Sequence, residues 1–197
     1  MNSVYDKLNV LVVCGVPEHV SDFEQVLDNA GHNLAMREIH DDKLLLWFEQ
    51  YKPDIFIIDV ETVTEKIFLS LQKILRKDPC PIIVFTHDDD RVSIGRAISA
   101  GISVYVVKGY SPKRIVPLID TAIHRFNQTR AMLDELVTTR HKLEDRKLIE
   151  RAKGIVMRKS AVDEAVAYKT LRDMAMSSNM KLAEVAKSIV TASELLV

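Results

Sequence analysis

The sequence is poor in the residues that mark secreted, metal-binding and membrane proteins. Its 197 residues include only two cysteines, Cys14 and Cys80, too few and too poorly placed for a disulfide framework or a zinc site. We predict that both are free thiols. No apolar run approaches the roughly 20 residues that span a bilayer, and Met1-Asn2-Ser3 opens no signal peptide. We therefore expect a cytoplasmic protein with no membrane partner.

Net charge is also low, at −1, but the charges are divided unevenly along the chain. Residues 1–110 carry 11 basic and 17 acidic side chains, whereas residues 111–197 carry 16 basic and 11 acidic ones. Eight of the basic side chains lie between Arg140 and Lys159. A basic helical segment attracts polyphosphate through counterion release, although many plain solvated helices have the same composition.

Short β-branched runs alternate with amphipathic stretches in the first 110 residues. The alternation predicts an α/β fold, a doubly wound five-stranded parallel sheet with right-handed crossovers. Gly31 and Gly101 are placed to end helices. The expected strands are 8–13, 33–38, 55–59, 82–86 and 103–107, and the expected helices are 18–30, 43–51, 65–76 and 91–100.

One long helix is expected after Ser111-Pro112, because no glycine follows until Gly154 and Pro117 lies early enough to be tolerated. Its apolar residues follow a near-heptad spacing, which fits a dimer seam or packing within one chain. The spacing joins Phe126, Leu133, Leu136 and Leu143 and is interrupted by Thr129, Arg140 and Lys147.

The C-terminal part predicts two shorter helices, 163–176 and 180–193, joined by a turn at Ser177-Ser178-Asn179. With the end of the long helix they make a small all-α three-helix domain. We divide the chain into a receiver-like domain, 1–122, a helical linker or coiled coil, 123–140, and a C-terminal domain, 141–197. The core-facing positions of the first short helix are expected at Ala167, Leu171, Met174 and Ala175.

Three polar residues end or follow the predicted strands at the edge where doubly wound folds place their sites. Asp59 ends the third strand, Thr86 ends the fourth, and Lys108 follows the fifth, so we expect the three side chains to converge. Together they resemble the receiver domain of bacterial response regulators. The resemblance implies that Asp59 is the phosphoacceptor and that Thr86, Tyr105 and Lys108 form the switch. A carboxylate paired with a lysine for structure alone is the other interpretation.

The chain departs from the receiver pattern after the first strand, where the family has a pair of acidic residues that hold magnesium. Cys14 and Gly15 stand there, and they cannot supply the hard oxygen ligands that magnesium prefers. A second departure is Gly109 after Lys108, where proline is usual. We predict no cofactor, weak or absent magnesium-dependent phosphorylation, and regulation by a protein partner.

Gly154 is unusual in the middle of a predicted helix, because glycine costs about 1 kcal/mol relative to alanine there. Either a packed helix or a nucleic-acid backbone could approach it. We expect Lys153 and Arg158 on the exposed side of this helix. Tyr168 and Arg172 could stack on unpaired RNA bases, although a tyrosine on an amphipathic helix also serves as a half-buried packing residue.

The segment from Ala152-Lys153-Gly154-Ile155-Val156-Met157 through Ala167-Tyr168 and Leu171-Arg172 to Val185-Ala186 resembles the ANTAR domain of transcription antiterminators. A receiver, a long helix and an ANTAR domain are similar to the nitrate-assimilation antiterminators. The resemblance implies a dimer that binds paired hairpins in leader RNA and is controlled by a ligand-sensing protein. It implies RNA contacts at Lys153, Gly154, Arg158, Tyr168 and Arg172.

Three other functions compete with this interpretation. A phosphorylation-dependent response regulator would bind DNA through a helix-turn-helix, but residues 163–193 hold no strongly basic recognition helix. A flavodoxin-like enzyme would need a phosphate cradle or an activated nucleophile, and neither is visible, so we expect no catalysis. A protein-interaction module could dock through the long helix and bind no nucleic acid.

Overall fold

The computed structural model describes residues 7–194, so Met1-Asn2-Ser3, where no signal peptide is expected, lies outside the described residues. The chain forms two compact units, residues 1–130 and 131–197, and each is described by itself. No helix among the described residues is both long and apolar enough to cross a bilayer.

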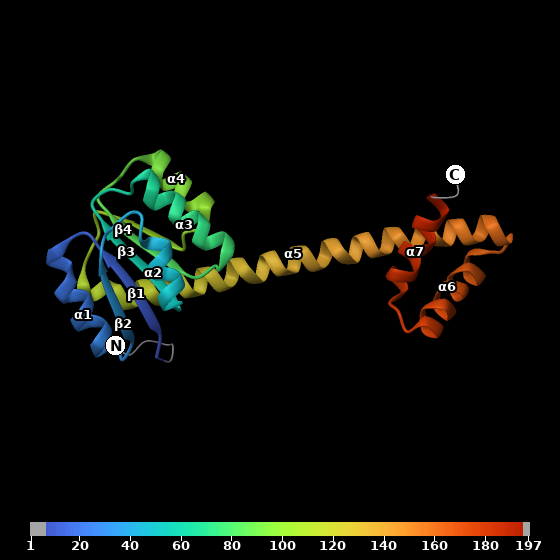
Figure 1. Ribbon diagram of the computed structural model, residues 1–197, viewed down its shortest axis with the longest axis horizontal. Coiled ribbons are helices and arrows are strands. Elements are labelled where there is room, and N and C mark those ends of the chain that lie inside the picture. The colour runs from blue at the N-terminus through green and yellow to red at the C-terminus, as the bar shows by residue number, and fades with distance from the viewer. Residues whose placement is uncertain (1–6, 195–197) are drawn as a thin grey trace. The chain divides into compact units, whose positions relative to one another are not determined.

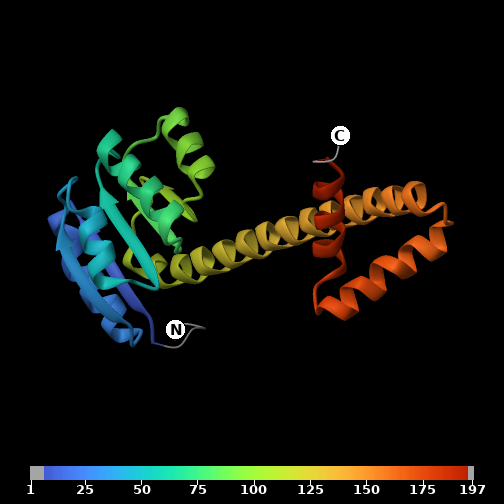
Figure 2. The same ribbon diagram turned by 45° about the vertical axis from the view of Figure 1, so that its right-hand side comes forward.

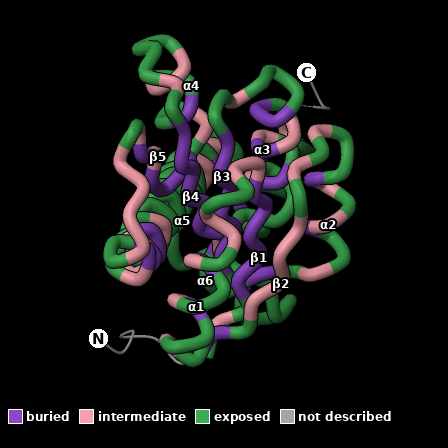
Figure 3. The backbone as a smooth tube through the Cα atoms, turned by 90° about the vertical axis from the view of Figure 1, so that its left-hand side faces the viewer, coloured by how far each residue is buried: buried purple, intermediate pink, exposed green. Residues whose placement is uncertain are grey.

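The first unit is built on a five-stranded parallel sheet (Figure 1). The strand order is β2-β1-β3-β4-β5, which confirms the predicted doubly wound α/β fold. Figure 3 shows the central strands as buried tube, and β3 is buried at every residue because helices cover both sheet faces. The strands are β1 (Asn9–Cys14), β2 (Asn33–Glu38), β3 (Ile55–Val60), β4 (Ile82–Thr86) and β5 (Val104–Val107).

Two hydrophobic cores lie on opposite faces of this sheet. On one face, Phe23 and Leu27 of α1 (Val20–Asn29) pack with Ile115 and Ile119 of α5 (Pro112–Ser160). The other face is covered by α2 (Leu44–Tyr51), α3 (Glu65–Lys77) and α4 (Arg91–Ala100). Both cysteines are buried free thiols, as predicted.

The expected helix 18–30 is split in two by the structure. Residues Pro17–His19 form a short 3₁₀ turn, η1, and α1 begins only at Val20. Pro17 stands at the start of the turn, where the fixed φ of proline is compatible with helical backbone. The split matters because it places His19 at the sheet edge. Gly31 and Gly101 follow helices with φ of +80° and +92°, as their predicted role requires.

The second unit packs α6 (Glu164–Ser178) and α7 (Leu182–Glu194) against the last turns of α5 (Figure 2). Ala152, Leu171, Ala186 and Val190 form its buried core. Met174, expected in this core, is 43% exposed, so that expectation was wrong.

The predicted turn at Ser177–Asn179 also differs from the structure. Helix α6 continues through Ser178, and the hydroxyls of Ser177 and Ser178 donate to the carbonyl oxygen of Met174 within the same helix. Asn179 ends the helix in the left-handed conformation, with φ of +53°.

Three apolar residues in the middle of the long helix α5 are exposed. Leu133, Leu136 and Leu143 are 57%, 61% and 53% exposed. Packing within one chain, one of the two interpretations of the heptad spacing, is therefore wrong for these three residues. Their exposure leaves the dimer seam as the interpretation to be tested.

Candidate functional site

The carboxylate of Asp59 lies at the carboxyl edge of the sheet but is almost withdrawn from water. The register pairs Cys14 of β1 with Asp59 of β3, so the end of β1 lies beside the carboxylate. Asp59 is 2% exposed, and the Cys14 Sγ lies 3.3 Å from its Oδ2. A buried carboxylate needs a charged or hydrogen-bonding partner.

His19 supplies that partner. Its Nδ1 lies 2.7 Å from Oδ2 of Asp59, and its side chain is 20% exposed. The ring of Tyr110 stacks on the imidazole, with ring centroids 3.4 Å apart and planes 13° from parallel. The Tyr110 hydroxyl lies 3.3 Å from Oδ2 of Asp22 on α1. Tyr110 and His19 therefore close the carboxylate from the solvent side.

Burial sets the proton affinities in this cluster. It raises the pKa of Asp59 above its ordinary value of 3.8, and the hydrogen bonds from His19 and Cys14 offset only part of the rise. Burial also raises the pKa of the Cys14 thiol to about 12. The thiol therefore stays protonated at neutral pH and is a poor metal ligand and a poor nucleophile.

The receiver fold implies a magnesium ion beside the aspartate, and the residues present do not fit one. Cys14 offers a protonated thiol, and Gly15 offers no side chain. A side chain at Gly15 has little room, since a Cβ there would lie 2.9 Å from Cγ2 of Ile39. Among residues 7–194 there is no group of three or more His, Cys, Asp or Glu side chains placed to hold a metal.

The predicted convergence of Asp59, Thr86 and Lys108 was wrong for Lys108. The ammonium of Lys108 forms an ion pair with Asp89 in the loop after β4, and 58% of its side chain is exposed. Asp89 is exposed and pairs with Lys108, whereas the buried Asp59 carboxylate pairs with His19.

The other two switch residues lie near the sheet edge but make different contacts. The Thr86 hydroxyl donates to the carbonyl oxygen of Glu61 at 2.9 Å and accepts from the amide of Asp88 at 3.1 Å. Burial raises the pKa of the half-buried Tyr105 to about 12. Within the described residues, the groups that contact Asp59 by side chain are thus His19 and Cys14 rather than Thr86 or Lys108.

Sequence reasoning missed both His19 and Tyr110. One signal was available: a strand-end aspartate that lacks its acidic neighbours and its metal still needs a compensating group. His19 is the only histidine in the loop that leaves β1, and Tyr110 replaces the usual residues after Lys108. Neither residue belongs to a recognisable motif, because the contact joins segments 40 and 91 residues apart.

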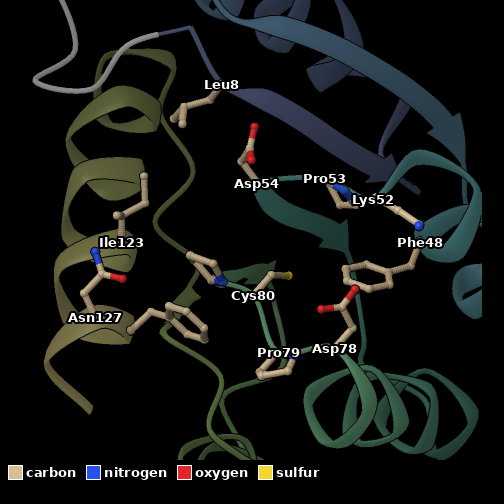
Figure 4. A pocket seen from close by; sticks show the side chains of 12 residues that line it. Leu8, Phe48, Lys52, Pro53, Asp54, Asp78, Pro79, Cys80, Ile123 and Asn127 are labelled. Carbon is tan, nitrogen blue, oxygen red and sulfur yellow. The ribbon is translucent and has the colours of Figure 1, made fainter. Parts of the chain in front are cut away.

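A hollow of about 410 Å³ lies at the opposite, amino edge of the sheet (Figure 4). Leu8, Asp54 and Cys80 line it from the segments that lead into β1, β3 and β4, and Ile123 and Asn127 line it from α5. Ligands of doubly wound folds bind at the carboxyl edge instead. Burial raises the pKa of Cys80 to about 12, so its thiol is unreactive, and we do not regard this hollow as the site.

In the second unit, the expected exposure of Lys153 was wrong. Lys153 is 7% exposed, and its Nζ lies 2.6 Å from Oε1 of Glu164 and 2.8 Å from Oε2 of Glu150. Hydrogen bonds first to Glu150 and then to Glu164 raise its pKa, so the ammonium stays charged. Lys153 therefore ties α5 to the first turn of α6 and does not present its charge to solvent.

The other predicted RNA contacts lie on the surface of this unit. Tyr168 is 44% exposed, which fits both a surface contact and the half-buried packing residue that is the alternative. Arg172 is exposed one turn further along α6, so the two side chains share one helix face. Arg158 is exposed on α5, and Gly154 is partly exposed. The structure thus brings Tyr168 and Arg172 together and places Gly154 and Arg158 on another helix.

Comparisons with known proteins identify the C-terminal part of the chain. The ANTAR domain model matches residues 138–190. The transcriptional regulatory protein PdtaR of Mycobacterium tuberculosis is 30% identical over 168 residues, which cover 85% of this chain and 82% of that protein. The nitrate regulatory protein of Klebsiella oxytoca is 34% identical over 83 residues, 42% of this chain but only 20% of that protein.

Solved structures similar to the first unit are receiver domains. The signal receiver domain of a modulated diguanylate cyclase from Desulfovibrio desulfuricans has a TM-score of 0.54 at 18% identity and covers 63% of this chain and 99% of that one. A CheY-like receiver domain protein from Methanospirillum hungatei has a TM-score of 0.55 at 15% identity, with the same coverage. At these identities the likeness establishes the fold alone.

The raised pKa of Asp59 predicts the pH dependence of stability. Because folded Asp59 holds its proton to higher pH than unfolded Asp59, stability falls as pH rises from the ordinary value of 3.8 through the raised pKa. The Asp59→Asn variant should not show this fall. At pH 7 its free energy of unfolding should equal or exceed that of the wild type, by up to about 1–3 kcal/mol. Urea unfolding between pH 3.5 and 8 measures it. With exposed Asp28→Asn as control, parallel wild-type and Asp59→Asn profiles would refute the prediction.

The cover over Asp59 predicts that acetyl phosphate with magnesium leaves the protein unlabelled. The carboxylate is closed by His19 and Tyr110, and the acidic ligands for magnesium are missing. Intact-mass spectrometry after incubation measures the label, with a phosphorylatable receiver as positive control. A stoichiometric, acid-stable and base-labile adduct that disappears in Asp59→Asn would show that the site is open.

Proposed function

This chain belongs to the family of transcriptional regulators that join a receiver domain to an ANTAR domain, and from that premise we propose that it is an antitermination regulator that binds hairpins in leader RNA. The observation that carries the proposal is the exposed pair Tyr168 and Arg172 on one face of α6, inside the matched ANTAR segment. An aromatic ring and a guanidinium plane one turn apart suit unpaired bases and their phosphates. The proposed role is regulatory binding rather than catalysis.

The proposal includes control by a partner protein rather than by a phosphoryl group. Asp59 is paired with His19, and Lys108 and Thr86 are committed to Asp89 and Glu61. In this arrangement Asp59 has neither the acid pair that would hold magnesium nor the Lys108 ammonium beside it to stabilise a phosphoryl group. A ligand-sensing protein that sequesters the regulator would act without either, and nitrate assimilation is the process that the resemblance suggests.

We place the homodimer contact of the proposed regulator on the exposed face of α5. Leu133, Leu136 and Leu143 are all more than half exposed and follow the near-heptad spacing of a coiled coil. Exposed apolar residues in such a row mark an interaction surface. A dimer would also present two copies of the Tyr168 and Arg172 face, as paired hairpins require.

RNA binding predicts distinct effects for the two residues on α6. Tyr168→Ala should weaken binding to leader RNA of neighbouring operons about 5- to 150-fold, the range of a lost stacking contact, whereas Tyr168→Phe should keep it. Arg172→Ala should lower the slope of log affinity against log salt by about 0.7. Fluorescence anisotropy at three salt concentrations measures both, beside duplex DNA of the same sequence. Preference for the duplex would contradict the proposal.

The dimer contact predicts that Leu136→Glu with Leu143→Glu yields a monomer. Both side chains are exposed, so the change should leave helix content unaltered while placing like charges in the seam. Thr138→Glu is the matched control, because residue 138 lies about 200° around the helix from residue 136. Light scattering after size exclusion measures the mass. A wild type that is monomeric at micromolar concentration would contradict the assignment.

A further inference from the structure

The side chains of Glu164, Tyr168 and Arg172 form one row along α6. They follow one another at intervals of four residues, so they lie on nearly the same face of the helix. Tyr168 and Arg172 are the two residues that carry the proposed RNA-binding function. Glu164 begins the row, and its Oε1 lies 2.6 Å from Nζ of Lys153 on α5. Lys153 therefore holds the first member of the row that would contact RNA.

The ammonium of Lys153 is fully occupied by carboxylates. An ammonium donates three hydrogen bonds. Three carboxylate oxygens lie within 2.9 Å of Nζ, two from Glu150 and one from Glu164. The Lys153 side chain is 9% exposed, whereas those of Glu150 and Glu164 are 56% and 67% exposed, so the group of three presents net negative charge to solvent. This arrangement repels a phosphate and disfavours direct contact between Lys153 and RNA.

Few buried apolar side chains hold α6 against α5. In the buried cluster of the second unit, α6 contributes Leu171 and α5 contributes Ala152. The turn between the two helices contains Ala161 in the left-handed conformation, with φ of +52°, which a residue with a Cβ adopts at a steric cost. The pair of Lys153 with Glu164 bridges this turn. A rotation of α6 about its axis would break the pair and would move the whole row to another side of the unit.

We propose that Lys153 is a positioning residue, which holds Glu164 and thereby sets the direction in which Tyr168 and Arg172 face the RNA. The inference rests on the proposed RNA-binding function and departs from the resemblance, which implies that Lys153 itself contacts RNA. It also gives an acidic residue, Glu164, a supporting role in the binding of a polyanion.

The sign of the Glu164→Gln effect tests the inference. The probe is a labelled hairpin RNA pool with randomised loop bases, measured by fluorescence anisotropy with the full-length protein. Charge alone predicts tighter binding, because the variant removes an anion. The positioning role predicts weaker binding, by about fivefold, the lower end of the range for a lost stacking contact. Asp173→Asn is the matched control, because Asp173 is an exposed acid of the same helix outside the ion pair; it should bind as well as the wild type or more tightly.

Lys153→Met separates positioning from direct contact, because methionine keeps an unbranched chain and removes the charge. Hairpin binding should weaken by about tenfold, within the range of a lost stacking contact. In an Arg172→Ala background, where the positioned cation is already missing, Lys153→Met should leave the slope of log affinity against log salt unchanged. A phosphate contact at Lys153 would lower that slope by about 0.7.

A second background separates positioning from a merely structural role. If Lys153 acts through Tyr168, Lys153→Met should weaken binding less in a Tyr168→Ala chain than in the wild type. A loss of stability alone would weaken binding equally in both chains. Circular dichroism monitors the fold. If Lys153→Met loses helix content, Glu164→Gln measured in the same two chains decides the matter, because the Glu164 side chain is exposed.

The outcomes distinguish the positioning role from the proposed function. Tighter binding by Glu164→Gln, or a salt slope lowered by about 0.7 in the Arg172→Ala background, overturns the positioning role and leaves the RNA-binding function standing. Equal weakening in the wild-type and Tyr168→Ala chains assigns Lys153 to stability alone and overturns it as well. Absence of hairpin binding by the wild type overturns the proposed function and the inference with it.

Discussion

The buried carboxylate of Asp59 is the constraint on which the first unit depends. A carboxyl group that is 2% exposed needs a hydrogen-bonding partner, and in this chain the imidazole of His19 is one. This pairing accounts for the residues that surround Asp59. Pro17 starts the short turn that delivers His19, Cys14 donates a second hydrogen bond to the carboxyl group, and Tyr110 covers the imidazole two residues before α5 begins.

The second unit also buries one ionisable side chain, but there it is a cation. Lys153 is a buried cation neutralised by two carboxylates, one from its own helix and one from α6. The pair with Glu164 joins two helices, so it ties the first turn of α6 to the long helix. Each unit therefore satisfies one buried charge internally, and in each the charge belongs to a residue that its sequence motif would assign to ligand binding.

The strands and helices could be predicted closely because they depend on local patterns. The β-branched runs before Asp59 and Thr86 specify buried strands, and Gly31 and Gly101 end helices through a positive φ that glycine adopts without steric cost. The hydrogen-bond and ion-pair partners of polar side chains were harder to predict, because they join residues that are distant in the sequence. Lys108 had a choice between Asp59 and Asp89, and His19, 40 residues from Asp59, decided it.

The partners of Lys153 were also hard to predict, although they lie closer to it in the sequence. Helical periodicity places it beside the apolar face and cannot tell whether it turns outward or inward. The answer depends on Glu164, which is brought within 2.6 Å by the turn after Ser160, where Ala161 has a φ of +52° and Asp163 caps α6. A turn of this kind has no strong sequence signal, so the buried pair could not be foreseen.

The charge pattern along α5 bears on where the proposed dimer forms. Leu133, Arg140, Lys147 and Gly154 follow one another at intervals of seven residues, so they lie on nearly one face of the helix. In a parallel pair the leucine end of this face attracts its copy, and the lysine and arginine repel theirs. Two copies would therefore be closest near Leu136 and would separate toward Gly154. Separation there leaves the basic end of this face open to a polyanion, which is attracted by the same charges that hold the two helices apart.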